Sequence, residues 1–188
     1  TTGAGSTFTN STGTTDAYTA TCLSSDRNIQ ISNGSITLSG SGTGGKGISC
    51  DGTLTVGASN YNPIVTITTT GSKITISSSS GAGGGFGGGW GGGGGMDDGG
   101  TYSEAKAISC DGAVTFNSGT TTISSADDGI KSTTSVTINS GTVNITKAVE
   151  GIESPAITVN NGTVSIAASD DGFNATKGNG GESNDKNL

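Results

Sequence analysis

The sequence predicts an all-β protein, a right-handed parallel β-helix built from coils of about 21 to 22 residues. Three observations predict this fold. A short motif around a glycine returns at a fixed interval, the segments between these motifs alternate apolar and polar residues, and equal spacings separate apolar positions in successive segments. Together they favour a solenoid over a β-sandwich, because sandwich turns come at variable spacing and do not align in columns.

The recurring motif is "DDG" and its variants. Gly129, Gly151 and Gly172 are spaced 22 and 21 residues apart, and an apolar residue follows each of them. The segments "AKAISCDG" and "GKGISCDG" repeat the pattern at Ala107 and Gly47. The apolar column therefore contains Leu23, Ile48, Ile108, Ile130, Ile152 and Phe173. A period of this length indicates one structural unit per repeat.

Strict alternation marks the segments between the motifs. The segments "VTIN" (136–139), "TVNIT" (142–146), "AITV" (156–159) and "TVSI" (163–166) have the period of two that half-buried strands show. The turns "SG" and "NNG" join them, and the apolar residues across these turns are 7 apart in Ile31–Leu38, Phe116–Ile123, Ile138–Ile145 and Val159–Ile166. Such coils must stack about 4.8 Å apart to bury their apolar faces. Parallel connections are generally right-handed, which sets the expected hand.

One domain is predicted over residues 1–188. The coil that begins at Gly47 is much longer than the others, and it contains a glycine-rich insertion at about 77–104. Within it, residues 81–100 include 14 glycines, a composition that cannot pack as a helix or a strand. A polar tail follows at about 177–188.

Composition excludes several classes of function. The chain has a formal net charge of −7 and no histidine, so it lacks a basic footprint for nucleic acid, a Ser-His-Asp triad and the commonest zinc ligand. No apolar run is long enough to insert into a membrane. The surplus of Thr, Ser, Gly and Asn indicates an extracellular or cell-surface protein, and we expect a monomer.

Three cysteines, Cys22, Cys50 and Cys110, show no metal-binding spacing. Cys50 and Cys110 share a column. We expect buried, stacked thiols there, with a disulfide between them as the alternative.

Carboxylates recur beside the motif glycine. The position before it holds Lys106, Asp128, Glu150 and Asp171 in successive coils. Stacking would place like charges one strand spacing apart, and such a ladder needs protonation, salt bridges or a hard cation. Ca²⁺ accepts 6 to 8 oxygen ligands and suits this position. The predicted ligands are Asp127, Asp128, Glu150, Asp170, Asp171 and Glu153.

The sequence also allows a simpler explanation of these acidic residues. Asp before Gly is a favoured turn dipeptide, so these acids can be solvated turn residues, with Lys106 as a salt-bridge partner of Asp128. In the next column Lys131 and Glu153 are neighbours, and we expect an exposed ion pair that contributes little to stability.

The segments "DDGIKS", "VTINSGTVNIT", "EGIES" and "ITVNNGTVSIAASDDGFNA", with "GGGFGGGW" in the insertion, resemble a known family. It is the secreted bacterial carbohydrate-binding domain family, whose members are parallel β-helices similar in fold to pectate-lyase-like polysaccharide lyases. The resemblance is close over residues 105–177 and looser over 17–80. It implies calcium at the Asp and Glu corners and binding of plant cell-wall polysaccharide, either cellulose or pectin-like.

A polysaccharide would suit the flat faces of the strands, which are rich in hydroxyl groups. Thr115, Thr137 and Thr158 form the predicted ladder on one face, and Asn144 lies on the neighbouring face. Aromatic rings for stacking on sugars are few: Trp90, Tyr61, Tyr102 and Phe86, all in or beside the insertions. As an alternative, Trp90 and Phe86 pin the glycine-rich loop to the β-helix.

Two other functions remain open on the sequence. A calcium-dependent polysaccharide lyase would need a base, for which Lys106 and Lys131 are the candidates, but nothing in the sequence indicates a lowered lysine pKa. We therefore expect no catalytic residues. A structural surface adhesin, or an ice-binding face, is the third possibility, although Asn144 and Ser165 interrupt the regular threonine columns that ice binding requires.

Overall fold

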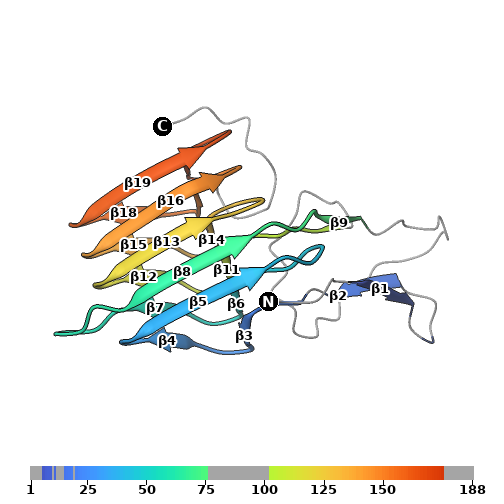
Figure 1. Ribbon diagram of the computed structural model, residues 1–188, viewed down its shortest axis with the longest axis horizontal. Coiled ribbons are helices and arrows are strands. Elements are labelled where there is room, and N and C mark those ends of the chain that lie inside the picture. The colour runs from blue at the N-terminus through green and yellow to red at the C-terminus, as the bar shows by residue number, and fades with distance from the viewer. Residues whose placement is uncertain (1–5, 10, 12–14, 19, 76–101, 176–188) are drawn as a thin grey trace.

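The computed structural model describes residues 6–9, 11, 15–18, 20–75 and 102–175, and every regular element in these residues is a β-strand (Figure 1). No helix in this part of the chain is long and apolar enough to cross a membrane. The strands of successive coils lie above one another in three parallel sheets. The predicted all-β solenoid is confirmed.

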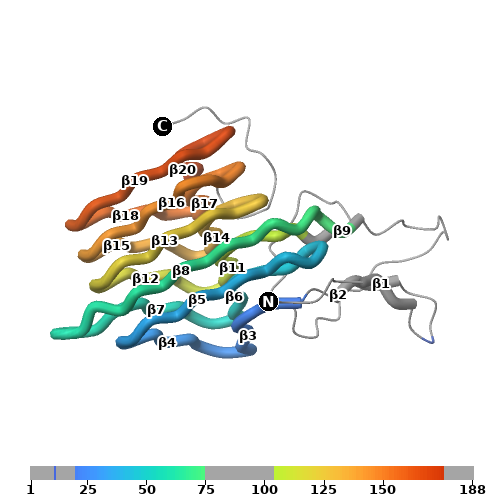
Figure 2. The backbone as a smooth tube through the Cα atoms, in the orientation of Figure 1, coloured from blue at the N-terminus to red at the C-terminus, as the bar shows by residue number. Residues whose placement is uncertain are grey.

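Each complete coil contributes one strand to each sheet, and β20 of the last coil extends sheet 1 alone. Sheet 1 contains β3 (Leu23–Ser25), β6 (Ile48–Cys50), β11 (Ile108–Cys110), β14 (Ile130–Ser132), β17 (Ile152–Glu153) and β20 (Phe173–Asn174). Sheet 2 contains β4 (Ile29–Ile31), β7 (Leu54–Val56), β12 (Val114–Phe116), β15 (Val136–Ile138) and β18 (Ile157–Val159). Sheet 3 contains β5 (Ser35–Gly40), β8 (Ile64–Thr69), β13 (Thr120–Ser124), β16 (Thr142–Ala148) and β19 (Thr163–Ala168). The backbone tube shows this regular stacking (Figure 2).

The predicted columns are in register. Ile108 pairs with Ile48 on one side and Ile130 on the other, and Ile152 and Phe173 continue the same row. Inward apolar residues of the three sheets form one core in which Ile48, Ile108, Ile130 and Ile152 are fully buried. Each such side chain contributes about 1.5–3 kcal/mol through burial. In the last coil the apolar side chains are less covered, and Phe173 is 45% exposed.

Two small antiparallel pairs lie outside the three sheets. β1 (Ser6–Thr9) pairs with β2 (Thr15–Tyr18), and β9 (Ile74–Thr75) pairs with β10 (Tyr102–Ser103). The second pair is the stem through which the long coil leaves and rejoins the solenoid. The glycine-rich residues 76–101 and the tail 176–188 lie outside the described residues.

Cys50 and Cys110 are partners in the register of sheet 1, and both are buried free thiols. The expectation of stacked thiols is confirmed over the disulfide alternative. The Cys50 thiol donates to the carbonyl oxygen of Gly52 at 3.3 Å, and the side chain is part of the buried core.

Candidate functional site

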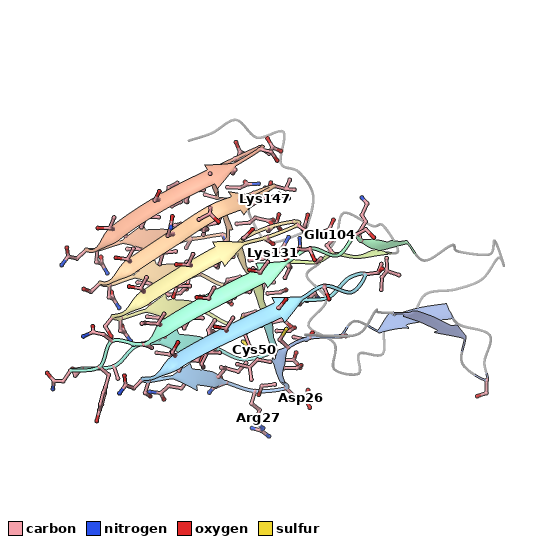
Figure 3. All side chains as sticks on the ribbon, viewed as in Figure 1. Asp26, Arg27, Cys50, Glu104, Lys131 and Lys147 are labelled. Atoms are coloured by element: carbon pink, nitrogen blue, oxygen red, sulfur yellow. The ribbon has the colours of Figure 1, made fainter. Side chains whose placement is uncertain are left out.

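The acidic corner, defined as residues 104–106, 125–129 and 147–153, lies where the chain passes from sheet 3 to sheet 1. Along it, backbone N–H groups donate to carbonyl oxygens of the following coil: Ala107 to Asp128, Gly129 to Glu150 and Gly151 to Asp171. The backbone therefore stacks Lys106, Asp128, Glu150 and Asp171 as the repeat predicted. Figure 3 shows Glu104, Lys131 and Lys147 at this edge of the molecule, where the strands of sheet 3 end.

Three buried carboxylates converge at the corner. Oxygen atoms of Asp128, Glu150 and Glu153 all lie within 4.8 Å of one another, a grouping able to hold a metal ion. Burial raises the pKa of Asp128 to about 6, although the charge of Lys106 opposes the shift. Burial likewise raises the pKa of Glu150 to about 7, against the hydrogen bond that Asn174 donates to it at 2.6 Å. Without a further cation, the site thus favours bound protons.

Glu153, like Asp128, has a lysine partner, whereas Glu150 accepts a hydrogen bond from the Asn174 amide. The Glu153 carboxylate lies 2.7 Å from the Lys131 ammonium, and the predicted pairing is confirmed. Burial alone would raise the pKa of Glu153, but the hydrogen bond and charge of Lys131 hold it below its ordinary value. The expected exposure of this pair was wrong, since both side chains are 11% exposed. The small contribution to stability that is typical of exposed ion pairs therefore does not apply to this pair.

Lys106 is held by three carboxylates. Its ammonium lies 2.6 Å from Glu104, 2.7 Å from Asp127 and 2.6 Å from Asp128. Burial lowers the pKa of Lys106, but the charges of Asp128, Asp127 and Glu104 outweigh it and raise the pKa above its ordinary value. A lysine held this firmly in its ammonium form is unsuited to act as a general base.

The predicted ligands divide into three groups. Asp128, Glu150 and Glu153 come together, whereas Asp127 bonds to Lys106 beside them. The side chains of Asp170 and Asp171 are exposed in the last coil. The salt bridge foreseen between Lys106 and Asp128 is present beside this carboxylate group. The expectation of solvated turn residues was wrong for Asp128 and Glu150, since both are buried.

Sequence reasoning missed Glu104 and the hydroxyls that support the corner. Glu104 has no counterpart in the other coils, and its only signal was its spacing of two from Lys106, which places both on one side of an extended chain. The fully buried Ser125 hydroxyl donates to the carbonyl oxygen of Asp128 at 2.8 Å and lies 3.0 Å from the Thr69 hydroxyl. These bonds fix the backbone that carries Asp128.

The predicted polar ladder on sheet 2 is in register. Thr115 pairs with Thr137, and Thr137 with Thr158, between inward apolar neighbours, so their hydroxyls face outward. Asn144 occupies the equivalent outer row of sheet 3, beside Ser165. We call Thr115, Thr137 and Thr158 the threonine row. It contains no charged side chain and so presents a hydroxyl surface suited to hydrogen bonds with sugars.

The predicted aromatic residues are only partly described. Tyr61 is 50% exposed and lines an open surface cavity of about 410 Å³. Tyr102 contributes its backbone to β10, while its side chain, Trp90 and Phe86 lie outside the described residues.

Comparison with known proteins adds one finding. The model of the carbohydrate-binding domain-containing protein family matches residues 4–151, which is more than half of the chain. No curated protein and no solved structure matches the sequence.

Proposed function

This chain belongs to the carbohydrate-binding domain-containing protein family, and from that premise we propose that it is a non-catalytic, extracellular binder of plant cell-wall polysaccharide that carries a structural calcium ion. The family match is the observation that supports carbohydrate binding. It includes Thr115 and Thr137 of the threonine row and Asp128 and Glu150 of the acidic corner. The proposed ligand is a cellulose-like or pectin-like chain.

The calcium part of the proposal has its own support. Asp128, Glu150 and Glu153 supply carboxylate oxygens within 4.8 Å of one another, and hard oxygen donors are the ligands that Ca²⁺ prefers. Glu150 has an amide, from Asn174, as its hydrogen-bond partner rather than an ammonium group. A divalent cation would offset the charge that burial otherwise disfavours. It would tie two consecutive coils together at this corner.

A polysaccharide lyase is the weaker reading of the same corner. β-Elimination needs a base that can take a proton, yet Lys106 is stabilised in its protonated form by three carboxylates. Lys131 forms a buried ion pair with Glu153. The geometry therefore supports binding over catalysis.

Metal analysis and glycan binding test the proposal together. Native protein is analysed for bound elements by mass spectrometry, and a glycan array is then probed before and after chelation. We expect stoichiometric calcium and binding to plant cell-wall glycans. The double variant E150Q/E153Q should lose calcium, whereas D170N, an exposed acid of the last coil, should retain it. Calcium-free native protein, or calcium retained by E150Q/E153Q, would contradict the ion site, and a blank glycan array would contradict polysaccharide binding.

A further inference from the structure

The asparagine corner, defined as the turns 57–63, 117–119, 139–141 and 160–162, lies where the chain passes from sheet 2 to sheet 3. It is the edge of sheet 3 opposite the acidic corner (Figure 1). Three of the turns have three residues, but 57–63 has seven, and it projects beyond them between β7 and β8 (Figure 1). The longer loop adds a wall beside the regular row that the other three turns form.

The loop 57–63 is braced against the next coil. The Ser118 hydroxyl donates to the carbonyl oxygen of Tyr61 at 2.5 Å, and Asn60 takes a left-handed conformation with φ of 67° in the turn before it. Gly119 of the next coil lies close to the loop, because a Cβ there would be 2.3 Å from the carbonyl oxygen of Pro63. These contacts fix the backbone that carries the Tyr61 ring, so ordering the loop on ligand binding costs little entropy.

The cavity beside this loop is polar and carries no charge. Its lining includes Tyr61, Asn62 and Asn117, and every other lining residue is also uncharged. Half of the Tyr61 surface is exposed to solvent. An exposed, positioned tyrosine offers an apolar face for a sugar ring, and the amides around it offer donors and acceptors for hydroxyl groups.

A row of amides continues from the cavity along the solenoid axis. Asn139 donates from Nδ2 to Oδ1 of Asn117 at 2.9 Å, and Asn160 donates from Nδ2 to Oδ1 of Asn139 at 2.7 Å. Each primary amide has two N–H groups and two acceptor lone pairs, so these bonds orient the amide and leave further hydrogen-bonding capacity. The side chains of Asn139 and Asn160 are exposed.

We propose that the asparagine corner binds a neutral, extended polysaccharide that runs along the solenoid axis, with one sugar ring stacked on Tyr61 and the following rings hydrogen-bonded to Asn117, Asn139 and Asn160. Coils repeat about every 4.8 Å, comparable with the length of one pyranose residue in an extended chain. This inference rests on the proposed carbohydrate-binding function and adds the location and charge class of the ligand.

The uncharged lining decides the class of polysaccharide. A uronate chain would bring a carboxylate to each step of the row, beside amides that supply no positive charge and on a protein of net charge −7. A neutral chain loses no ion hydration on entering the site. The site also needs no metal, because the acidic corner is at the other edge of sheet 3 (Figure 1).

Calorimetric titration with cello-oligosaccharides of two to six sugars, as neutral probes, tests the inference. Affinity should rise with length up to about four sugars, one for Tyr61 and one for each asparagine of the row, and then level off. Y61A and N160A should each weaken binding of the longer probes by about tenfold or less, the effect of one stacking or hydrogen-bonding contact. Y61F should bind as the native protein does, because it keeps the ring.

T137A is the matched control, because it removes an outward hydroxyl from the neighbouring face of sheet 2. Far-UV circular dichroism and Tm establish that each variant is folded, and all three altered side chains are at least partly exposed. Weaker binding in Y61A with native binding in T137A supports the inference. The reverse result overturns it and places the sugar on the threonine row. Binding of oligogalacturonate with Ca²⁺, but of no neutral probe, overturns the ligand class. Both outcomes leave the proposed function intact, whereas a failure of every glycan to bind removes the two together.

Discussion

The balance of charges around Lys106 determines the state of the acidic corner. Glu104, Asp127 and Asp128 share its single ammonium group. Each of these acids is largely buried, so the charge that Lys106 supplies is not replaced by water if the ammonium is removed. The lysine is therefore a structural cation of the corner, and its loss would leave the three surrounding carboxylates without a charge partner.

Replacing this ammonium should destabilise the protein strongly. K106M should lower the free energy of unfolding by about 3–5 kcal/mol at pH 8, the cost of leaving buried charges without a partner. The loss should shrink at pH 5, where carboxylates of raised pKa such as Asp128 take up protons. Urea unfolding in the presence of chelator measures both values. K147M, which alters an exposed lysine of the same edge, should stay within about 0.5 kcal/mol of the native protein. Equal effects of the two substitutions would show that the network around Lys106 adds nothing.

The elements of this fold were predictable wherever the sequence repeats. Ile108, Ile130 and Ile152 revealed the register of sheet 1 because their spacing copies the length of a coil. Features that occur once were not predictable in this way. Glu104 lies at the end of the insertion, and none of the other described turns from sheet 2 to sheet 3 is as long as the loop 57–63, so neither feature belongs to a column. The burial of the Lys131–Glu153 pair also escaped the pattern, since alternation assigns a side chain to the outer face without saying how crowded that face is.

The corner glycines allow adjacent coils to approach closely. A Cβ on Gly129 would lie 2.6 Å from the carbonyl oxygen of Gly151 and 2.9 Å from Ile145 Cδ1, and one on Gly151 would lie 2.3 Å from the carbonyl oxygen of Gly172. In the last coil a Cβ on Gly172 meets only Ile166 Cγ2 at 3.9 Å, an ordinary contact. One column therefore contains both tight and open positions.

This difference predicts the effect of alanine at two positions of one column. G129A should lower the free energy of unfolding by about 1–3 kcal/mol, because backbone of the neighbouring coil must shift to admit the methyl group. G172A should change it by no more than about 0.5 kcal/mol. Thermal unfolding of the two variants under one buffer condition gives the comparison. If G172A is as destabilising as G129A, close contact with the backbone of the adjacent coil is not the reason for glycine in this column.

At the scale of the whole molecule, the two candidate binding regions occupy opposite edges of sheet 3. In a solenoid each coil contacts its neighbours, so stability is close to a sum of coil and interface terms. An ion at the acidic corner would bridge the coils that contain Asp128 and Glu150, and the asparagine row crosses the same coils at the other edge. A bound ion would therefore act on the proposed sugar binding through the stability of these shared coils and not by direct contact.

The dependence of global stability on pH should reverse when calcium is added. Burial raises the pKa values of Asp128 and Glu150 to about 6 and about 7, so the folded protein holds protons that the unfolded chain has released. Stability of the metal-free protein should therefore be greatest near pH 5 and fall as the pH rises through these values. Asp127 and Glu153, whose pKa values are lowered, act in the opposite sense only in more acidic solution.

Ca²⁺ competes with protons for Asp128 and Glu150, so its stabilising effect should grow from pH 5 to pH 8. Scanning calorimetry with EGTA or with calcium measures both slopes, and the double variant D128N/E150Q should flatten them. A Tm that rises with pH in EGTA would contradict the buried-carboxylate account of this corner.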